Sequence, residues 1–229
     1  MQFSPAVDAT AYDDWLASLP ADEAVSVYVH IPFCRRLCWY CGCNTRVVNG
    51  DGPVSRYVRI GLDHFALRGD GLAVAASDGK VMRNFQGYGV SGPQNLIGFG
   101  ASAISQLRQG MAQNQTAELA WGQALDRGVL PTARGVALTP EDRLRGEVIE
   151  RLVCAFSVDL SEVTAAHHFP GDALDAAAPT LAQLERDGLI VRSGSVVNVT
   201  ALGRPYVRAV CAAFDAYLEP EARRHALAV

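Results

Sequence analysis

The feature that most restricts the fold of this chain is a strand-like segment that ends in a cluster of cysteines. Every second residue from Val25 to Ile31 is apolar and β-branched, which is the period of a β-strand. Pro32 follows and has no N–H to donate to a neighbouring strand, so it ends the ladder. Four of the six cysteines then lie within ten residues, namely Cys34, Cys38, Cys41 and Cys43. The sequence therefore predicts a strand that leads into a thiol-rich loop at its carboxyl end.

The spacing of the first three thiols, C-x3-C-x2-C, favours a metal or cluster site. Cysteine thiolates hold iron–sulfur clusters. Zinc sites more often show two C-x2-C pairs or histidines at fixed offsets, and this sequence has neither pattern. Close-set cysteines in a chain without a secretory signal also argue against a disulfide scaffold. We predict that Cys34, Cys38 and Cys41 bind a metal or cluster, with incidental thiols as the alternative.

Composition limits the class of protein and its location. The chain has 229 residues, a net charge of −4 and 49% hydrophobic residues, enough for one large domain or two ordinary ones. Only 19% of the residues are charged, so neither a nucleic-acid footprint nor a polybasic membrane patch is indicated. The first 20 residues carry three aspartates, and no apolar run approaches about 18 residues. We therefore expect no signal peptide, no membrane span and a reducing, cytoplasmic location.

Residues 1–24 are predicted to form an N-terminal arm, and residues 119–229 a mainly helical C-terminal domain. The arm has apolar residues at helical spacing up to Pro20, at Tyr12, Trp15, Leu16 and Leu19. In the C-terminal domain, Thr139 and Pro140 supply an N-cap and a first-turn proline. The helix that follows has an apolar stripe formed by Leu144, Val148, Ile149, Leu152, Val153 and Phe156.

The rest of the C-terminal domain reads as two more helices separated by a hairpin. A helix is predicted from near Asp172 to Gly188, and the hairpin turns at Ser193–Ser195. Pro205 fits the first turn of the last helix. The buried residues expected on the two helices are Leu174, Leu181, Leu184, Tyr206, Val210, Phe214 and Tyr217. Cys154 and Cys211 lie on apolar helical faces and are predicted core residues, while His167 and His168 are expected to be solvated or to cap a helix.

Helices followed by a short hairpin resemble a winged-helix fold, so a non-catalytic nucleic-acid-binding module is an alternative function. Against it, the second helix of this domain has four acidic residues and only one base, Arg186. Binding to phosphates needs the opposite sign of charge. We therefore expect no nucleic-acid partner.

The cysteine loop and several later segments resemble one enzyme family. The run YVHIPFCRRLCWYCGCN, residues 28–44, is similar to the cluster loop of oxygen-independent coproporphyrinogen III oxidases, which are radical S-adenosylmethionine (SAM) enzymes. The likeness continues in RNFQGY (Arg83–Tyr88), in GFGASAI (Gly98–Ile104) and in ARGVALTPEDRLRGEVIERL (Ala133–Leu152). It therefore covers most of the chain.

The resemblance implies two cofactors and a set of contact residues. A [4Fe–4S] cluster would be held by Cys34, Cys38 and Cys41, with SAM on the iron that they leave open, whereas Cys43 is not normally a ligand. The residues that match SAM contacts in the family are Tyr28, Tyr40, Phe85, Gln86 and Ile104. Phe85 and Gln86 correspond to the surroundings of a second SAM, and Ile104 to an adenosyl contact.

The resemblance also implies a reaction. Family members convert coproporphyrinogen III to protoporphyrinogen IX in haem biosynthesis by turning two propionates into vinyl groups. The conversion consumes two SAM and needs an electron donor and an electron acceptor, neither of which the sequence identifies. We expect a monomer. Within the same superfamily, a haem-binding or chaperone-like relative is the alternative.

One part of the family pattern is missing, near residues 59–61. In the family a long stretch of an α/β barrel separates the segments that meet there, and a barrel of this kind takes about 250 residues. Residues 51–59 should begin a helix after the cluster loop, and residues 25–118 are expected to form only a partial radical SAM domain. A lone parallel strand cannot satisfy both of its edges, so we expect poor packing or a borrowed partner there. The chain itself is predicted to be inactive.

The glycine-rich stretch over residues 81–104 has two interpretations. By the resemblance it is the last part of the barrel. From its residues alone, a loop before a core strand or helix is the simpler interpretation. The fold class expected for the whole chain is α/β: a remnant of a (β/α) barrel joined to a winged-helix-like domain.

Overall fold

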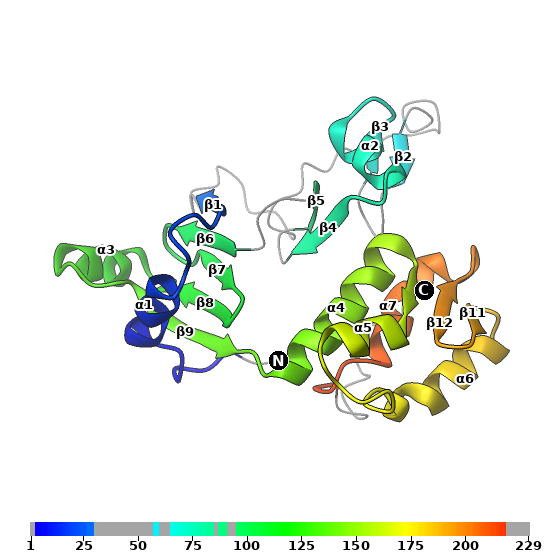
Figure 1. Cartoon of the computed structure of the whole chain (residues 1–229). Coiled ribbons are helices and arrows are strands. Elements are labelled where there is room, and N and C mark those ends of the chain that lie inside the picture. The colour runs from blue at the N-terminus through cyan, green and yellow to red at the C-terminus, as the bar shows by residue number, and fades with distance from the viewer. Residues whose placement is uncertain (1–2, 30–56, 60–64, 85–86, 91–94, 219–229) are drawn as a thin grey trace. The chain divides into compact units, whose positions relative to one another are not determined.

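The computed structural model describes residues 3–29, 57–59, 65–84, 87–90 and 95–218 (Figure 1). The chain divides into two compact units. The first comprises residues 1–50 and 92–139, and the second comprises residues 51–91 and 140–229. Each unit therefore combines two stretches that are far apart in the sequence.

The first unit is built on a five-stranded sheet with the strand order β1-β6-β7-β8-β9. Its strands are β1 (Val25–Val29), β6 (Asn95–Phe99), β7 (Ile104–Leu107), β8 (Gly110–Asn114) and β9 (Thr132–Ala137). β1 pairs in parallel with β6, and the other neighbours are antiparallel. The strand predicted from Val25 to Ile31 is confirmed over Val25–Val29, the rest lying outside the described residues, and it is not a lone strand. The antiparallel run from β6 to β9 was not recognised in the sequence, and β6 supplies the partner.

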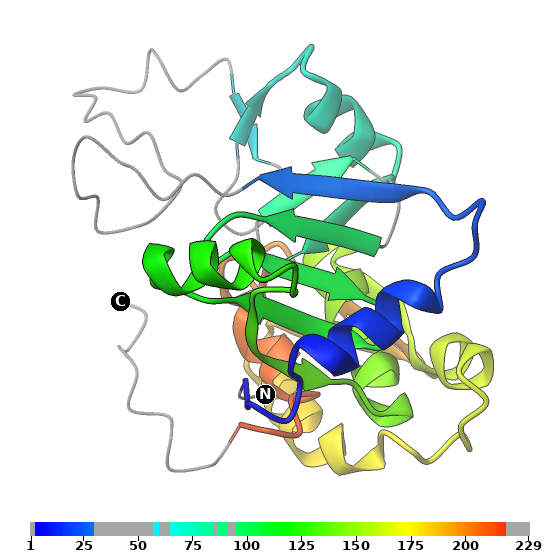
Figure 2. The same ribbon diagram turned by 90° about the vertical axis from the view of Figure 1, so that its left-hand side faces the viewer.

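Two helices lie on the same side of this sheet (Figure 2). Helix α1 (Ala9–Ala17) confirms the predicted arm helix, and the carboxylate of its N-cap Asp8 accepts a hydrogen bond from the Ala11 N–H. Tyr12 of α1 is buried against Leu107 and Ala112, so the arm covers one face of the sheet. Helix α3 (Glu118–Asp126) buries only Ala124 among its residues and leaves Leu119 75% exposed.

The second unit begins with short strands where a helix was expected. Its first elements are β2 (Tyr57–Arg59), β3 (Phe65–Leu67), α2 (Gly71–Ser77), β4 (Val81–Asn84) and β5 (Gly87–Val90). The prediction that a helix begins within residues 51–59 is wrong for residues 57–59, since these form β2, which pairs with β3 in antiparallel register. Aromatic and β-branched residues such as Tyr57 and Val58 favour strands once a partner is present. The stretch over residues 81–104 is likewise mostly strand where it is described, not a simple loop.

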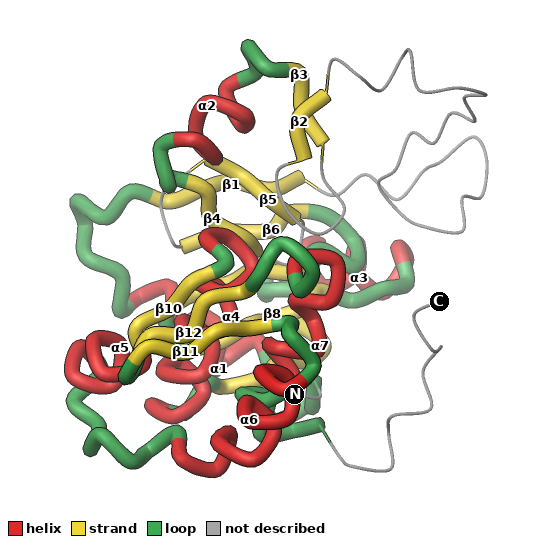
Figure 3. The backbone as a smooth tube through the Cα atoms, turned by 90° about the vertical axis from the view of Figure 1, so that its right-hand side faces the viewer, coloured by secondary structure: helices red, strands yellow, loops and turns green. Residues whose placement is uncertain are grey.

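The helical stripe predicted for the C-terminal part is confirmed up to Val153, but Phe156 lies beyond the end of the helix, with a positive φ of 57°. Helix α4 (Pro140–Ala155) buries Leu144, Val148, Leu152 and Val153. The other elements are β10 (Ser157–Asp159), α5 (Leu160–Ala166), α6 (Ala178–Arg186), β11 (Ile190–Ser193), β12 (Val196–Val199) and α7 (Val207–Ala212), with 3₁₀ turns at Asp175–Ala177 and Arg204–Tyr206. Strand β12 lies between β10 and β11 (Figure 3). The predicted hairpin is therefore part of a three-stranded sheet.

Three details of this region differ from the prediction. Helix α6 begins at Ala178 and not near Asp172, because a 3₁₀ turn precedes it and a proline occupies its first turn. Tyr206 and Tyr217 are exposed, since the last helix is confined to Val207–Ala212 and buries Val207 and Val210 instead. Strand β10 and helix α5 were also not predicted.

Among the described residues, no helix has the length and apolar character needed to cross a bilayer.

Candidate functional site

Most of the predicted cofactor residues lie outside the described residues. These are the cluster ligands Cys34, Cys38 and Cys41, together with Tyr40, Phe85 and Gln86. Two thiols are described, and both are core residues: Cys211 is buried and Cys154 is half-buried. Burial raises the pKa of each to about 12, so both stay protonated and neither is a ready metal ligand. Elsewhere in the described ranges, no three His, Cys, Asp or Glu side chains gather as a metal site would require.

The two described SAM candidates flank the same glycine. Tyr28 on β1 is opposite Gly98 on β6 in the parallel register. On the other side, a Cβ at Gly98 would lie 2.7 Å from the carbonyl oxygen of Ile104 on β7, closer than real Cβ contacts come. Glycine is therefore required for the backbones of β6 and β7 to approach this closely. The structure places Tyr28 on β1 and Ile104 on β7, the two strands on either side of β6, although they lie far apart in the sequence.

The turn between β6 and β7 is tightly constrained. Gly100 and Ser102 both have positive φ, of 109° and 62°. Residues other than glycine rarely adopt a positive φ. Ala101 and Ala103 are buried, so the turn lies against the unit. Its peptide groups are bound by the end of β8: the Ser102 N–H donates to the Gln115 carbonyl at 2.8 Å. The local sequence GFGASA thus forms a packed turn and not an open loop.

Asn114, the last residue of β8, provides further contacts to that turn. Its Nδ2 donates to the Gly100 carbonyl at 2.9 Å, and its backbone N–H donates to the Ala103 carbonyl at 2.9 Å. The side chain is only 7% exposed. Asn114 carries no local sequence signal, because its bonds depend on the pairing of β7 with β8.

Buried Ser105 connects helix α1 to strand β6 at Gly98. Ser105 Oγ accepts hydrogen bonds from the Tyr12 hydroxyl at 2.7 Å and from the Gly98 N–H at 3.0 Å. Burial raises the pKa of Tyr12, and the hydrogen bond to Ser105 lowers it by less, so the phenol stays protonated and remains a donor. The N-terminal arm therefore supports β6 at Gly98, the residue paired in register with Tyr28.

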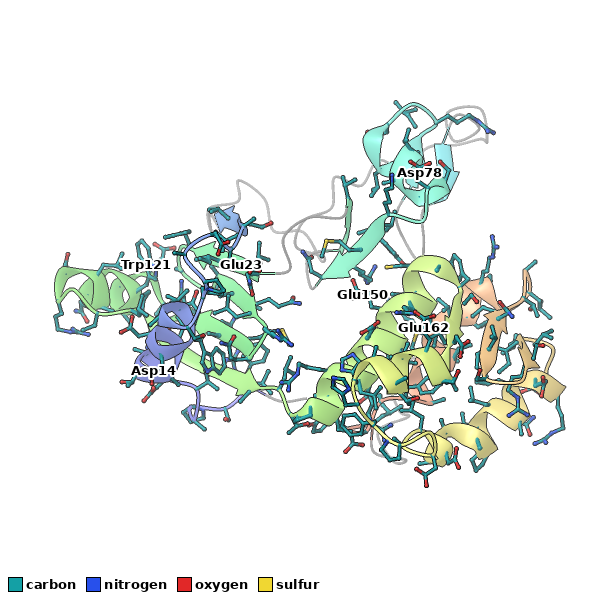
Figure 4. All side chains as sticks on the ribbon, in the orientation of Figure 1. Asp14, Glu23, Asp78, Trp121, Glu150 and Glu162 are labelled. Carbon is teal, nitrogen blue, oxygen red and sulfur yellow. The ribbon has the colours of Figure 1, made fainter. Side chains whose placement is uncertain are left out.

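The hairpin β4–β5, which carries most of the RNFQGY motif, is anchored to helix α4. Arg83 pairs with Tyr88 in the antiparallel register, and its guanidinium lies 4.6 Å from the centre of the Tyr88 ring. The Arg83 N–H donates to Glu150 Oε1 at 3.2 Å, and the Tyr88 hydroxyl donates to the Val153 carbonyl at 2.9 Å. Glu150 extends from α4 in Figure 4. Two residues of α4, Glu150 and Val153, thus fix the Arg83–Tyr88 pair of this hairpin.

The environment of Glu150 affects its charge. Burial raises its pKa, the N–H of Arg83 opposes that rise, and the nearby Glu147 adds to it. Glu147 itself belongs to a network that joins α4 to α5. Its carboxylate contacts Arg151 Nη2 and His167 Nε2, both at 2.7 Å.

The capping role expected for His167 is confirmed, because its backbone N–H donates to the Val163 carbonyl at the end of α5. Its imidazole is not merely solvated, since it contacts Glu147. This pair could not be predicted from the sequence, because Glu147 lies on α4 and His167 at the end of α5. Of the four acidic residues expected on the second helix, α6 contains only Glu185, beside one base, Arg186. Glu185 is paired with Arg192 at 2.8 Å.

The comparisons with known proteins agree on one group of relatives. Residues 138–206 match the family described as the HemN C-terminal domain. An oxygen-independent coproporphyrinogen III oxidase of Bradyrhizobium diazoefficiens is 44% identical over 173 residues, or 76% of this chain and 38% of that relative. A protein of the same description from Cereibacter sphaeroides is 39% identical over 170 residues, or 73% of this chain and 37% of that relative.

A solved structure gives the same result. It is the coproporphyrinogen III oxidase HemN of Escherichia coli, described as a radical SAM enzyme. The likeness has a TM-score of 0.68 and 40% sequence identity, and covers 72% of this chain and 38% of that one. The chain thus spans about 38% of the length of these relatives.

Proposed function

Since this chain is homologous to the oxygen-independent coproporphyrinogen III oxidases, we propose that it binds a [4Fe–4S] cluster and SAM. The proposed cluster ligands are Cys34, Cys38 and Cys41. The proposed SAM contacts are Tyr28, Tyr40, Phe85, Gln86 and Ile104. The observation that supports the proposal most directly is the arrangement at Gly98 on β6, because Tyr28 is on the strand on one side of it and Ile104 on the strand on the other side.

The donor sets suit these two groups. Three thiolates at C-x3-C-x2-C spacing are soft ligands suited to an iron–sulfur cluster, and they leave one iron for another ligand. The described Cys154 and Cys211 do not compete, because burial keeps them protonated. At the Gly98 corner, the role of the chain is to place an apolar side chain, Ile104, beside the cofactor and to keep the backbone rigid.

The proposed reaction is that of the family. Each of two propionates of coproporphyrinogen III loses one hydrogen atom, one electron and carbon dioxide, and a vinyl group remains. When bound, the cluster and SAM supply the reducing electron and the radical that takes the hydrogen atom. The substrate electron goes to an acceptor, and neither the acceptor nor the electron donor is identified here. We place the protein in the cytoplasm, as a monomer.

We further propose that this chain binds the cofactors without turning over substrate. In the family, a stretch of barrel separates the segments that meet near residues 59–61. The parallel pair β1–β6 supports the interpretation of the first sheet as part of that barrel. The order α4, β10, α5, α6, β11, β12 supports a winged-helix-like C-terminal domain.

Anaerobic reconstitution of the whole chain with iron and sulfide, followed by SAM, tests the proposal. We expect a bound cluster whose reduced electron paramagnetic resonance signal changes when SAM is added, and no 5′-deoxyadenosine formed at enzymatic rates. The matched control is Cys154→Ala with Cys211→Ala, which should keep the cluster. An electron paramagnetic resonance signal that does not change when SAM is added would contradict the proposed SAM site. Steady formation of 5′-deoxyadenosine would contradict the proposed inactivity of the chain.

A further inference from the structure

We propose that Asn114 is a positioning residue for SAM: its buried amide fixes the turn between β6 and β7, and that turn places Ile104 for contact with the adenosyl group. This inference rests on the proposed function, since the role of Ile104 belongs to it. Asn114 itself is not proposed to touch the cofactor.

The first argument is the number of bonds that Asn114 makes to one short turn. Its Nδ2 binds the carbonyl of Gly100, at the start of the turn, and its N–H binds the carbonyl of Ala103, at the end. The same Nδ2 lies 3.5 Å from the carbonyl of Gly98, the residue that faces Tyr28. One residue of β8 therefore holds both ends of the connection between β6 and β7.

The second argument is that the turn needs this support. Gly100 and Ser102 have positive φ, a conformation that is unfavourable for a residue with a side chain such as Ser102. Ala101 and Ala103 have no polar side-chain atoms with which to stabilise it. Hydrogen bonds from outside the turn must therefore offset the cost of this backbone conformation, because strained backbone persists only where the surrounding structure determines it.

The third argument is that an amide is the right group at this position. Asn114 is buried, with 7% of its surface exposed, so its NH₂ needs partners inside the unit. An aspartate there would present a carboxylate to the carbonyls of Gly98 and Gly100, both of which are acceptors. An alanine would leave the Gly100 carbonyl with only the longer bond from the Ala103 N–H at 3.3 Å, without the Asn114 donor at 2.9 Å.

The test compares Asn114→Ala and Asn114→Asp with wild type in the whole reconstituted chain. The measurements are iron content, the dissociation constant for SAM, and amide hydrogen exchange over residues 98–104. We expect unchanged iron content, SAM binding weaker by about fivefold for Asn114→Ala and by more for Asn114→Asp, and faster exchange in the turn. Asn198→Asp is the matched control, because Asn198 on β12 lies in the other unit and bonds Ser157.

A double-mutant cycle with Ile104→Ala separates positioning from a general loss of stability. If Asn114 acts through Ile104, then Asn114→Ala weakens SAM binding in the wild-type background and has little further effect in the Ile104→Ala background. An equal effect in both backgrounds would overturn the inference, as would unchanged SAM binding in Asn114→Ala. A wild-type chain that holds iron but does not bind SAM would overturn the proposed SAM site and this inference with it. Asn114→Ala alone completes the cycle if Asn114→Asp does not fold.

Discussion

The hydroxyl of Tyr88 donates a hydrogen bond to the backbone carbonyl of Val153 at 2.9 Å, in buried surroundings. This bond joins strand β5 to helix α4 through two residues that are 65 positions apart in the sequence. Helix α4 belongs to the part of the chain that matches the HemN C-terminal domain. Tyr88 of the RNFQGY segment is therefore held by a helix of the HemN C-terminal domain match, and not by residues near the cysteine loop in the sequence.

Replacing Tyr88 with phenylalanine should destabilise the second unit. The change keeps the ring under the guanidinium of Arg83 but removes the donor to the Val153 carbonyl, and a buried bond of this kind is worth about 1 kcal/mol. Urea unfolding followed by circular dichroism measures the loss. Tyr206→Phe is the control, since Tyr206 is 47% exposed, and it should leave the unfolding midpoint unchanged. Equal midpoints for wild type and Tyr88→Phe would show that the bond adds nothing.

Replacing Gly98 with alanine should destabilise the first unit by about 1–3 kcal/mol, the usual cost of overpacking. The new Cβ would lie 2.7 Å from the carbonyl oxygen of Ile104, and backbone cannot move aside as the end of a side chain can. Thermal unfolding provides the measurement. Gly122→Ala on α3 is the control, because nothing lies within 4 Å of its Cβ position and alanine favours a helix. It should be neutral or slightly stabilising, and a neutral Gly98→Ala would contradict the packing described at this corner.

Replacing Glu147 with glutamine should lower stability near neutral pH, with a difference that shrinks in acid. Burial alone would raise the pKa of Glu147, but its bonds to His167 and Arg151 outweigh burial and lower that pKa below its ordinary 4.5. The carboxylate therefore stabilises the fold above pH 4.5, and its contribution disappears as the pH falls through the lowered pKa. We expect a contribution of about 1 kcal/mol or less, since a third of the side chain is exposed and solvent screens the pair.

The measurement for Glu147→Gln is the unfolding midpoint between pH 7 and pH 3. Glu118→Gln is the control, because Glu118 is an exposed residue in the first turn of α3. A difference between wild type and Glu147→Gln that stays constant across the whole range would rule out the carboxylate as its cause.

Replacing Val27 with lysine should reduce self-association. Val27 is 63% exposed on β1, which is at one end of the strand order, and an apolar strand in that position is a template for pairing with another chain. Light scattering at increasing protein concentration measures the effect. Leu119→Lys is the control for added charge alone, since Leu119 is 75% exposed on α3 and away from any strand edge. Equal improvement by both substitutions would exclude a specific role for the strand.

The features that could be predicted from the sequence were the ones that depend on local periodicity. The stripe formed by Leu144, Val148 and Leu152 has the spacing of one helical face, and the structure buries all three residues. The hairpin turn at Gly194, with φ of 61°, follows from residues that favour turns. The strand over Tyr57–Arg59 was expected to be helical, because its partner β3 lies in another segment that the pattern did not reveal.

The support of the candidate site could not be predicted, because it depends on distant contacts. Tyr12 and Ser105 are 93 residues apart, and neither has a pattern that marks it as more than an aromatic on a helix or a serine in a strand. Asn114 meets the turn only because β8 pairs beside β7. The cysteine spacing, in contrast, is a local signal, and Cys34, Cys38 and Cys41 remain a prediction outside the described residues.

The most direct test of the central claim is the iron content of the whole chain after anaerobic reconstitution, compared with a variant in which Cys34, Cys38 and Cys41 are all alanine. We expect about four iron and four sulfide per chain in wild type, the content of one cubane cluster, and almost none in the triple variant. A triple variant that retains as much iron as wild type would contradict the assignment of these three thiols.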